Sequence, residues 1–367
     1  MRKDRRPRGV ICFTNPEQLV YIRQNGTYGN VGIGDIPSKQ SPQAISAARR
    51  IRFGKLNDLL CVKSGDLVFL FETVASKLHG VWKVVDDPFY STTNIFDPKD
   101  IYPYRLLMER YLEFPNPVPA MELRKLLDKG MLWTIRTFER EVQAAFASIN
   151  PISIAESEAI LDLFWRYNHQ FAPPRTIPSY SHQPLSNSIN YHDLVINDVY
   201  QSADDLKIEA NDLGQFQTGS ILEEALHCFL IYNLVRGSAQ MRNMFGNYAQ
   251  VLREAPVSTA GQQRADVLLI YENPITAEPS VYSLMEIKRG EVTGAMLRQL
   301  LEYLKLFSER HGIDSNAIEG IYLGKDFSPE AKDYAKKRAA IEVERPIRLV
   351  QYTISGNSID LTEVSST

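Results

Sequence analysis

The chain has 367 residues, which is long enough for two domains with their own hydrophobic cores. Its 44% hydrophobic and 23% charged residues are typical of folded globular protein. A formal net charge of −3 gives no sign of a nucleic-acid partner, but that charge is unevenly distributed. Residues 1–60 contain 11 Lys or Arg and 4 Asp or Glu, so this end carries +7 and the rest −10. The basic start is either a solvated tail or an arm that contacts phosphate, and it contains Arg2, Lys3, Arg5, Arg6 and Arg8.

The three cysteines, Cys12, Cys61 and Cys228, are far apart and odd in number. They exclude a disulfide framework, and without a CxxC pair a zinc ribbon is not expected. No apolar run approaches the ~20 residues of a membrane span, and the N-terminus lacks the apolar core of a signal peptide. We therefore expect a cytoplasmic protein without a membrane partner.

The first part of the chain has the pattern of a β-structure. Residues 9–118 alternate short apolar runs with turn residues, which predicts the strands of a small barrel or half-barrel. The segment 43–60 is predicted to be helical at its start. It brings three basic residues close together as candidates for DNA contacts, Arg49, Arg50 and Arg52.

The pattern becomes helical after this region, with apolar residues at helical spacing from Ala120 and a second helix predicted over 152–167. Residues 171–190 are rich in Pro and Ser and are the best candidate for a linker. These features predict a first domain at 8–135, a helical connector and linker at 136–190, and a second domain at 191–367.

The second domain reads as helix, strand meander, helix and strand, which is an α/β pattern. Its first helix is predicted over 218–236, where Ser220 and Glu223 have the spacing of a capping box. The later elements are predicted as strands at 248–253, 264–271 and 281–288, a helix at 293–309, a strand at 318–323, a helix at 329–340 and a strand at 347–353.

Three chemically useful side chains fall on two of these strands. Asp266 opens one apolar run, and Glu286 and Lys288 follow another. Residues i and i+2 of a strand face the same side, so Glu286 and Lys288 project together. If the two strands are neighbours, Asp266 can meet them, and hard carboxylate oxygens beside a lysine suit Mg²⁺ and a phosphate.

The pattern Asp266…Glu286-x-Lys288 resembles the signature of PD-(D/E)xK nucleases of the restriction and RecB-like kind. The next helix carries Gln299 and Tyr303, which resemble the QxxxY element of the RecB-like branch. One departure is that Ala265, not proline, precedes the aspartate.

The resemblance also implies roles for these residues. Asp266 and Glu286 would bind Mg²⁺, or Mn²⁺ in its place, with help from a glutamate on the helix before the sheet. Glu223 is the better match for that glutamate and Glu224 the reserve. Lys288 would orient the attacking water and stabilise the phosphate, Gln299 would position Lys288 or the DNA backbone, and Tyr303 would lie near the DNA.

Arg264 is predicted to lie on the same strand face as Asp266. It either contacts DNA phosphate or forms an ordinary surface ion pair. Because one site per chain cuts one strand, cleavage of a duplex predicts a homodimer.

The first domain resembles a different family. Residues 65–72, 78–84 and 114–124 resemble the strands and the closing segment of the YTH/EVE family, which has a PUA-like fold. The resemblance covers 8–135 and implies a pocket in which aromatic side chains hold a flipped, modified base. Stacking on such rings contributes ~1–3 kcal/mol per base.

The candidate walls of that pocket are Trp82, Tyr28, Phe89 and Tyr90. For each of them, an ordinary place in the core or in a loop is the alternative interpretation. The sequence leaves this choice open.

Together these features predict an α+β protein in which a PUA-like barrel precedes an α/β nuclease core. The expected function is cleavage of DNA that carries a modified base, with methylation as the expected mark, as in restriction-type defence. Two alternatives remain open, namely a structure- or RNA-directed nuclease and an inactive protein that only binds nucleic acid.

Overall fold

The computed structural model describes most of both predicted domains, namely residues 7–30, 53–90, 102, 104–135, 148–169, 223–258, 263–340, 347–355 and 358–364. The chain divides into two compact units, Met1–Lys207 and Ile208–Thr367. Each unit combines a β-sheet with helices, so the predicted α+β class is confirmed.

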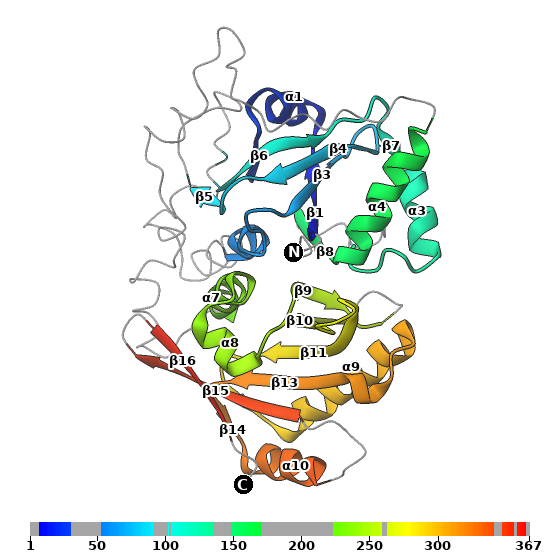
Figure 1. Cartoon of the computed structure of the whole chain (residues 1–367). Helices are drawn as coiled ribbons and strands as arrows, with labels where there is room; N and C mark the ends of the chain where they lie inside the picture. Colours follow the sequence, from blue (N-terminus) through cyan, green and yellow to red (C-terminus); the bar gives the residue numbers. More distant parts are fainter. Residues whose placement is uncertain are drawn as a thin grey trace. The chain divides into compact units, whose positions relative to one another are not determined.

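Unit 1 is built on a curled sheet, as the predicted half-barrel requires (Figure 1). The order of the main strands is β2-β6-β4-β3-β1-β8, with β5 paired to β6 and β7 to β4. Most neighbours are antiparallel, but β1 and β3 run parallel. The strands are β1 (Gly9–Thr14), β2 (Thr27–Asn30), β3 (Leu67–Glu72), β4 (Lys77–Val84), β5 (Phe89–Tyr90), β6 (Tyr104–Leu112), β7 (Val118–Pro119) and β8 (Ile149–Ile152).

The first helix, α1 (Pro16–Asn25), has clear local signals at both ends. The Asn15 side chain caps its N-terminus by accepting a hydrogen bond from the backbone of Gln18, and Pro16 follows at the first helical position. Gly26 ends the helix in the left-handed region, with φ of 63°. A second helical stretch covers 53–60.

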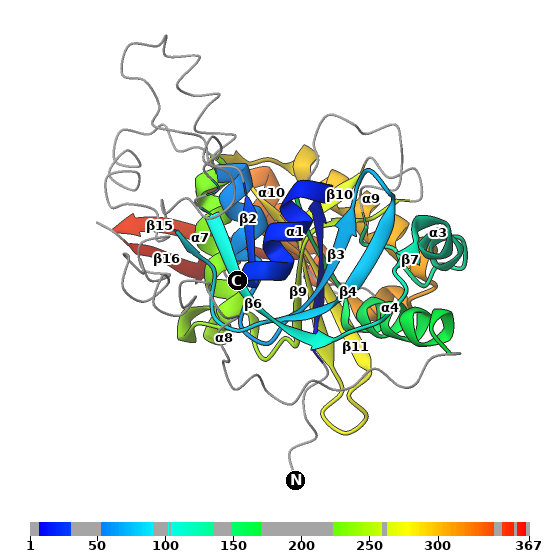
Figure 2. The ribbon, with the colours of Figure 1, turned by 90° about the horizontal axis from the view of Figure 1, so that it is seen from above.

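Two further helices, α3 (Ala120–Asp128) and α4 (Ile154–Tyr167), close the core of unit 1. Figures 1 and 2 both show them side by side next to β7. Leu123 of α3 and Phe164 of α4 are fully buried with Phe69 of β3. The fit is close, because a Cβ atom at Gly9 would lie 2.6 Å from the Ser157 hydroxyl of α4.

This packing extends unit 1 beyond the predicted domain boundary at 135. Strand β8 pairs antiparallel with β1, and Ile152 and Ile160 belong to the same core as the barrel strands. The predicted connector is therefore in part a structural component of the first domain. The predicted linker at 171–190 and the boundary at 191 lie outside the described residues.

Arg8 also departs from the prediction of a basic tail. It is 6% exposed, and its guanidinium donates to the Asp66 carboxylate and to the carbonyl of Cys61. A buried charge needs such partners, so Arg8 anchors β1 to the segment before β3 and does not reach phosphate.

Unit 2 contains a six-stranded sheet with the order β16-β15-β13-β11-β10-β9. β9, β10 and β11 form an antiparallel meander, whereas β11, β13 and β15 run parallel. Their bounds are β9 (Gln250–Pro256), β10 (Arg264–Glu272), β11 (Pro279–Ile287), β13 (Ile318–Gly324), β15 (Ile347–Ser355) and β16 (Ser358–Glu363). A separate pair joins β12 (Glu291–Val292) to β14 (Asp326–Phe327).

The helices of unit 2 cover this sheet, with α7 against β9 and α9 against β13 (Figure 1). They are α7 (Glu223–Arg236), α8 (Ala239–Phe245), α9 (Gly294–His311), the 3-10 turn η2 (Ser315–Ala317) and α10 (Pro329–Ala339). The predicted order of helix, meander, helix and strand is confirmed, while α8 and β16 were not predicted. The proposed cap Ser220 lies outside the described residues.

No helix in these described ranges is both long and apolar enough to cross a membrane.

Candidate functional site

Asp266 and Glu286 lie on neighbouring strands of unit 2, as the sequence predicted. β10 and β11 are antiparallel, and Val267 pairs with Met285, so Asp266 stands opposite Glu286. The Asp266 carboxylate accepts a hydrogen bond of 2.7 Å from the backbone nitrogen of Ile287. The two carboxylates therefore lie close together at one end of the strand pair.

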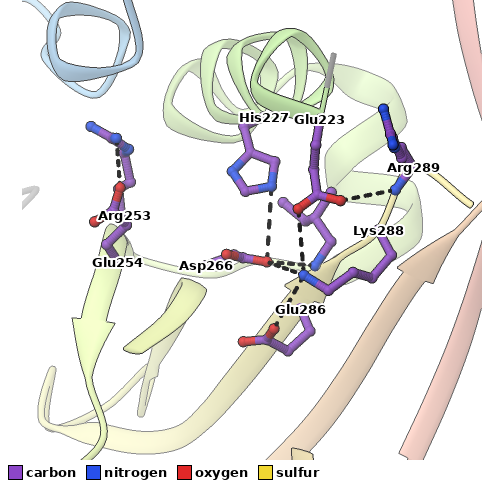
Figure 3. Close-up of polar contacts among 9 residues, drawn as sticks. Glu223, His227, Arg253, Glu254, Asp266, Glu286, Lys288 and Arg289 are labelled. Carbon is purple, nitrogen blue, oxygen red and sulfur yellow. Dashed lines mark hydrogen bonds and ion pairs between the residues drawn. The ribbon is translucent and has the colours of Figure 1, made fainter. Parts of the chain in front are cut away.

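Lys288 brings a positive charge into this group. Its backbone nitrogen donates to the Leu323 carbonyl over 2.8 Å, which continues the pairing of β11 with β13 past the end of the strand. Figure 3 shows its ammonium group among three carboxylates. Nζ lies 3.5 Å from Glu223, 3.8 Å from Glu286 and 4.0 Å from Asp266.

Glu223 reaches the same place from α7, although it precedes Asp266 by 43 residues in the sequence. Its second carboxylate oxygen accepts a hydrogen bond of 3.3 Å from the backbone nitrogen of Arg289. Of the two adjacent glutamates, Glu223 is the one whose carboxylate lies 3.5 Å from Lys288. The structure thus brings together the four residues that the sequence singled out, which are Asp266, Glu286, Lys288 and Glu223.

Glu286 is the most confined of these groups. Its side chain is 8% exposed, and its Oε1 is buried without a hydrogen-bond partner among the described residues. Burial first, and the neighbouring Asp266 carboxylate second, raise the pKa of Glu286 to about 8. Burial and the neighbouring carboxylate therefore both favour the protonated form of Glu286.

Lys288 remains an ammonium ion in this setting. Burial alone would lower the pKa of its amine, but the carboxylates of Asp266, Glu223 and Glu286 outweigh burial and raise it. A protonated lysine cannot accept a proton from water. It can stabilise negative charge that develops on a phosphate.

The donor set fits a divalent cation in its chemistry. Mg²⁺ prefers oxygen ligands and retains several waters, and the carboxylates of Asp266, Glu286 and Glu223 supply such oxygens around one point. Within the ranges that the structure describes, no three acidic, histidine or cysteine side chains already stand at metal-ligand spacing.

Gln299 and Tyr303 lie one turn apart on α9. The Gln299 amide donates to the Tyr303 hydroxyl over 2.9 Å, so Gln299 bonds to Tyr303 and not to Lys288. Tyr303 is 8% exposed, and its pKa is raised, first by burial, with contributions from Glu286 and Asp266. The pair therefore borders the carboxylates, and its contact with DNA stays a prediction.

His227 is a site residue that sequence reasoning gave little weight. Its Nε2 lies 3.9 Å from Asp266 Oδ2 and has no hydrogen-bond partner in the described part of the chain. Burial lowers the pKa of His227, so its imidazole is neutral at pH 7. The available signal was its spacing, because i and i+4 place it one turn from Glu223 on the same helix face.

Basic residues on β9 and β10 flank the carboxylates. Arg264 donates to the backbone carbonyl of Glu254 over 3.3 Å, and Arg253 forms an ion pair of 2.6 Å with the Glu254 side chain (Figure 3). Glu254 stands opposite Asp266 in the ladder and has a φ of 47°. A non-glycine residue in that region is strained, and such strain is concentrated at functional sites.

Three of the four candidate base-binding aromatics of unit 1, Tyr28, Trp82 and Phe89, are buried. Tyr28 is 1% exposed, and its hydroxyl lies 3.0 Å from the carbonyls of both Phe13 and Ser148. This arrangement supports the alternative interpretation, in which Tyr28 joins β1 to the start of β8. A wall residue for a base would need an accessible ring face.

The other three candidates lie on β4 and β5. Trp82 is 6% exposed, and the Arg110 guanidinium lies 5.5 Å from its ring. Phe89 is 3% exposed, and Tyr90 follows it in β5. Trp82 and Phe89 are therefore also interior side chains of the described structure. The three arginines predicted to contact DNA lie outside the described residues, namely Arg49, Arg50 and Arg52.

No protein-family model matches the chain, and no curated protein matches it. A hypothetical protein from Leishmania major is 13% identical, with 44% of this chain and 96% of that one covered and a TM-score of 0.30. A repair endonuclease from Pyrococcus abyssi is 17% identical, with 32% and 44% covered and a TM-score of 0.24. A complex of the YTH domain-containing protein mmi1 with RNA is 11% identical, with 45% and 87% covered and a TM-score of 0.28. These similarities are partial and weak, so a function can be proposed only from the site residues themselves.

Proposed function

We propose that the chain is a metal-dependent phosphodiester hydrolase whose site lies in unit 2. The observation that supports this most strongly is the convergence of Glu223, Asp266 and Glu286 on the ammonium group of Lys288. The raised pKa of the buried Glu286 adds to this support, because a strongly shifted pKa beside specific charged partners is typical of catalytic sites.

In this proposal Asp266, Glu286 and Glu223 hold Mg²⁺, or Mn²⁺ in its place. The cation, when bound, supplies Lewis acidity toward the phosphate and its attacking water. Lys288 stabilises the charge that develops on the phosphate as the water attacks. The hydrogen bond from Ile287 to Asp266 holds that carboxylate in place.

We further propose that the substrate is DNA and that unit 1 recognises a modified base in it. Linking a binding unit to a cutting unit raises the effective concentration of the cutting site beside the mark. The interior positions of Tyr28, Trp82 and Phe89 shift the expected pocket toward other residues of unit 1. A homodimer, with one site for each strand, is part of the same proposal.

The site assignment is tested by cleavage assays on the Asp266→Asn and Lys288→Ala variants with Mg²⁺ or Mn²⁺. Each change should reduce cleavage at least ~100-fold because it removes a charge that acts on the transition state. EDTA should abolish cleavage by the unchanged protein. The matched controls are Asp333→Asn and Lys305→Ala, two exposed residues outside the site that should keep full activity. Full activity of Asp266→Asn or Lys288→Ala would contradict the assignment.

The substrate is tested with short duplexes that carry 5-methylcytosine, 5-hydroxymethylcytosine or N6-methyladenine, beside plain DNA and RNA of the same sequence. We expect binding and cleavage to be strongest for one modified duplex. Equal cleavage of plain and modified DNA would contradict the reader role of unit 1. Cleavage of RNA alone would show an RNA-directed nuclease.

A further inference from the structure

Tyr322 lies in the middle of β13 and has a buried hydroxyl group. The residue is 0% exposed, and its hydroxyl has no hydrogen-bond partner among the described residues. Other buried tyrosines of unit 2 are bonded, since the Tyr248 hydroxyl donates to Leu234 over 2.8 Å and the Tyr352 hydroxyl to Arg289 over 2.6 Å. Tyr322 therefore differs from its neighbours in a way that needs an explanation.

The residue across from Tyr322 is Glu286. β11 and β13 are parallel, and their register pairs Glu286 with Tyr322, so the two side chains share a face of the sheet. A Cβ atom at Gly320, two residues earlier on that face, would lie 3.2 Å from Leu300 and from Leu304 of α9. Helix α9 thus covers this face and keeps bulk water from it.

Both members of the pair have unused hydrogen-bonding capacity. Glu286 Oε1 is buried without a partner, as is the Tyr322 hydroxyl. Burial raises the pKa of the Tyr322 phenol, and the Glu286 carboxylate is the charged group that raises it most. The phenol therefore stays protonated and can donate a hydrogen bond toward the carboxylate.

Leaving a buried polar group unpaired destabilises the folded state. Phenylalanine would fill the same space without that cost. A buried hydroxyl at the strand position paired with Glu286, whose Oε1 is also unpaired, therefore points to a use that arises when the site binds its metal.

We propose that Tyr322 is a positioning residue for Glu286. Its hydroxyl donates a hydrogen bond to Glu286 Oε1, directly or through one buried water, and so orients Oε2 toward the metal. This inference rests on the proposed function of the site. A hydrogen bond to one oxygen leaves the other oriented for the cation, and partners of this kind change metal affinity by ~10–100-fold.

The test compares the Tyr322→Phe and Tyr248→Phe variants of the full chain by two measurements. The first is the free energy of unfolding in urea with EDTA. The second is the dissociation constant for Mn²⁺, measured by electron paramagnetic resonance. For Tyr322→Phe we expect unchanged or higher metal-free stability and Mn²⁺ binding that is ~10–100-fold weaker. For Tyr248→Phe, which loses a bond present without metal, we expect lower stability and unchanged Mn²⁺ affinity.

The outcomes separate this inference from the function on which it rests. Equal Mn²⁺ affinity of Tyr322→Phe and the unchanged protein overturns the role of Tyr322 and leaves the metal site standing. Loss of metal-free stability in Tyr322→Phe, as large as in Tyr248→Phe, shows a structural hydroxyl and also overturns it. If the unchanged protein binds no Mn²⁺, the proposed function fails and the positioning role fails with it.

Discussion

Glu286 shows how a site residue can act against the stability of its own fold. Its carboxylate is almost completely buried, faces Asp266, and has one oxygen without a partner in the described structure. Lys288 compensates part of that charge at 3.8 Å. An apolar side chain would pack at this position without that loss of stability. We therefore interpret the destabilising burial of Glu286 as a requirement of the binding site.

This cost predicts the behaviour of the Glu286→Gln variant, which keeps the shape and removes the charge. The metal-free protein should become more stable at pH 8 by about 1–3 kcal/mol, because a buried charge is replaced by a neutral amide. The measurement is urea unfolding in EDTA, and the same variant should lose cleavage. Glu278→Gln, at an exposed turn, is the control that should change neither quantity. Lower stability of Glu286→Gln would contradict this interpretation.

His311, which lies away from the site, is expected to make the stability of the fold depend on pH. It lies at the end of α9 with its ring 4.5 Å from that of Phe307, and burial first and Arg310 second lower its pKa to about 4. Between pH 6.5 and 4 the unfolded chain binds a proton at this residue that the folded chain does not. The free energy of unfolding therefore falls as the pH falls through that range.

The His311→Gln variant should show a smaller loss of stability between pH 7 and pH 5 than the unchanged protein. The comparison uses urea midpoints at the two pH values. An equal loss in both proteins would show that His311 is accessible to protons in the folded state.

At the scale of elements, α4 is fixed by one buried carboxylate. Glu156 accepts hydrogen bonds from the backbone nitrogens of Trp133 and Thr134, at 2.6 and 2.8 Å, and from that of Ser153, at 2.8 Å. Ser153 caps the helix in return, which forms a capping box. One side chain thus joins the start of α4 to the segment that follows α3.

We expect Glu156→Ala to lower the free energy of unfolding by about 3 kcal/mol or more, because it leaves several buried donors without an acceptor. Asp162→Ala, on the exposed side of the same helix, should change it by less than about 0.5 kcal/mol. Thermal or urea unfolding of both variants makes the comparison. Similar effects of the two substitutions would mean that Glu156 does not hold the helix in place.

At the scale of the whole molecule, unit 1 needs residues beyond the predicted boundary at 135. β8 pairs with β1, and the buried side chains of α4 complete the core. A fragment of residues 1–135 would expose the edge of β1 together with that apolar surface.

We therefore expect a fragment of residues 1–169 to unfold cooperatively and a fragment of residues 1–135 to be unfolded or aggregated. Thermal unfolding by circular dichroism and the dispersion of amide resonances distinguish the two states. Cooperative unfolding of the shorter fragment would show that the domain folds without β8 and α4.

Much of unit 2 could be predicted from its sequence because periodicity reports local burial. The apolar runs before Glu286 and after Asp266 predicted two strands, and residues 293–309 were predicted as the helix that carries Gln299 and Tyr303, as found. Strand β16 was not predicted because its alternation of apolar and polar residues is short, and it can be recognised only from its pairing with β15. In unit 1 the aromatic residues were harder to place, because an interior ring and a ring in a binding pocket have the same local pattern.

The sequence by itself determined the types of element, their order and the acidic and basic residues available for chemistry, since all of these depend on neighbours along the chain. Only the tertiary structure decided that Glu223 meets Lys288, that His227 meets Asp266, and that β8 and α4 belong to unit 1. It also placed Tyr28 in the core and the hydroxyl of Tyr322 in register with Glu286. The physical reason is that burial and electrostatic coupling depend on strand register and on packing between distant segments, which local patterns do not specify.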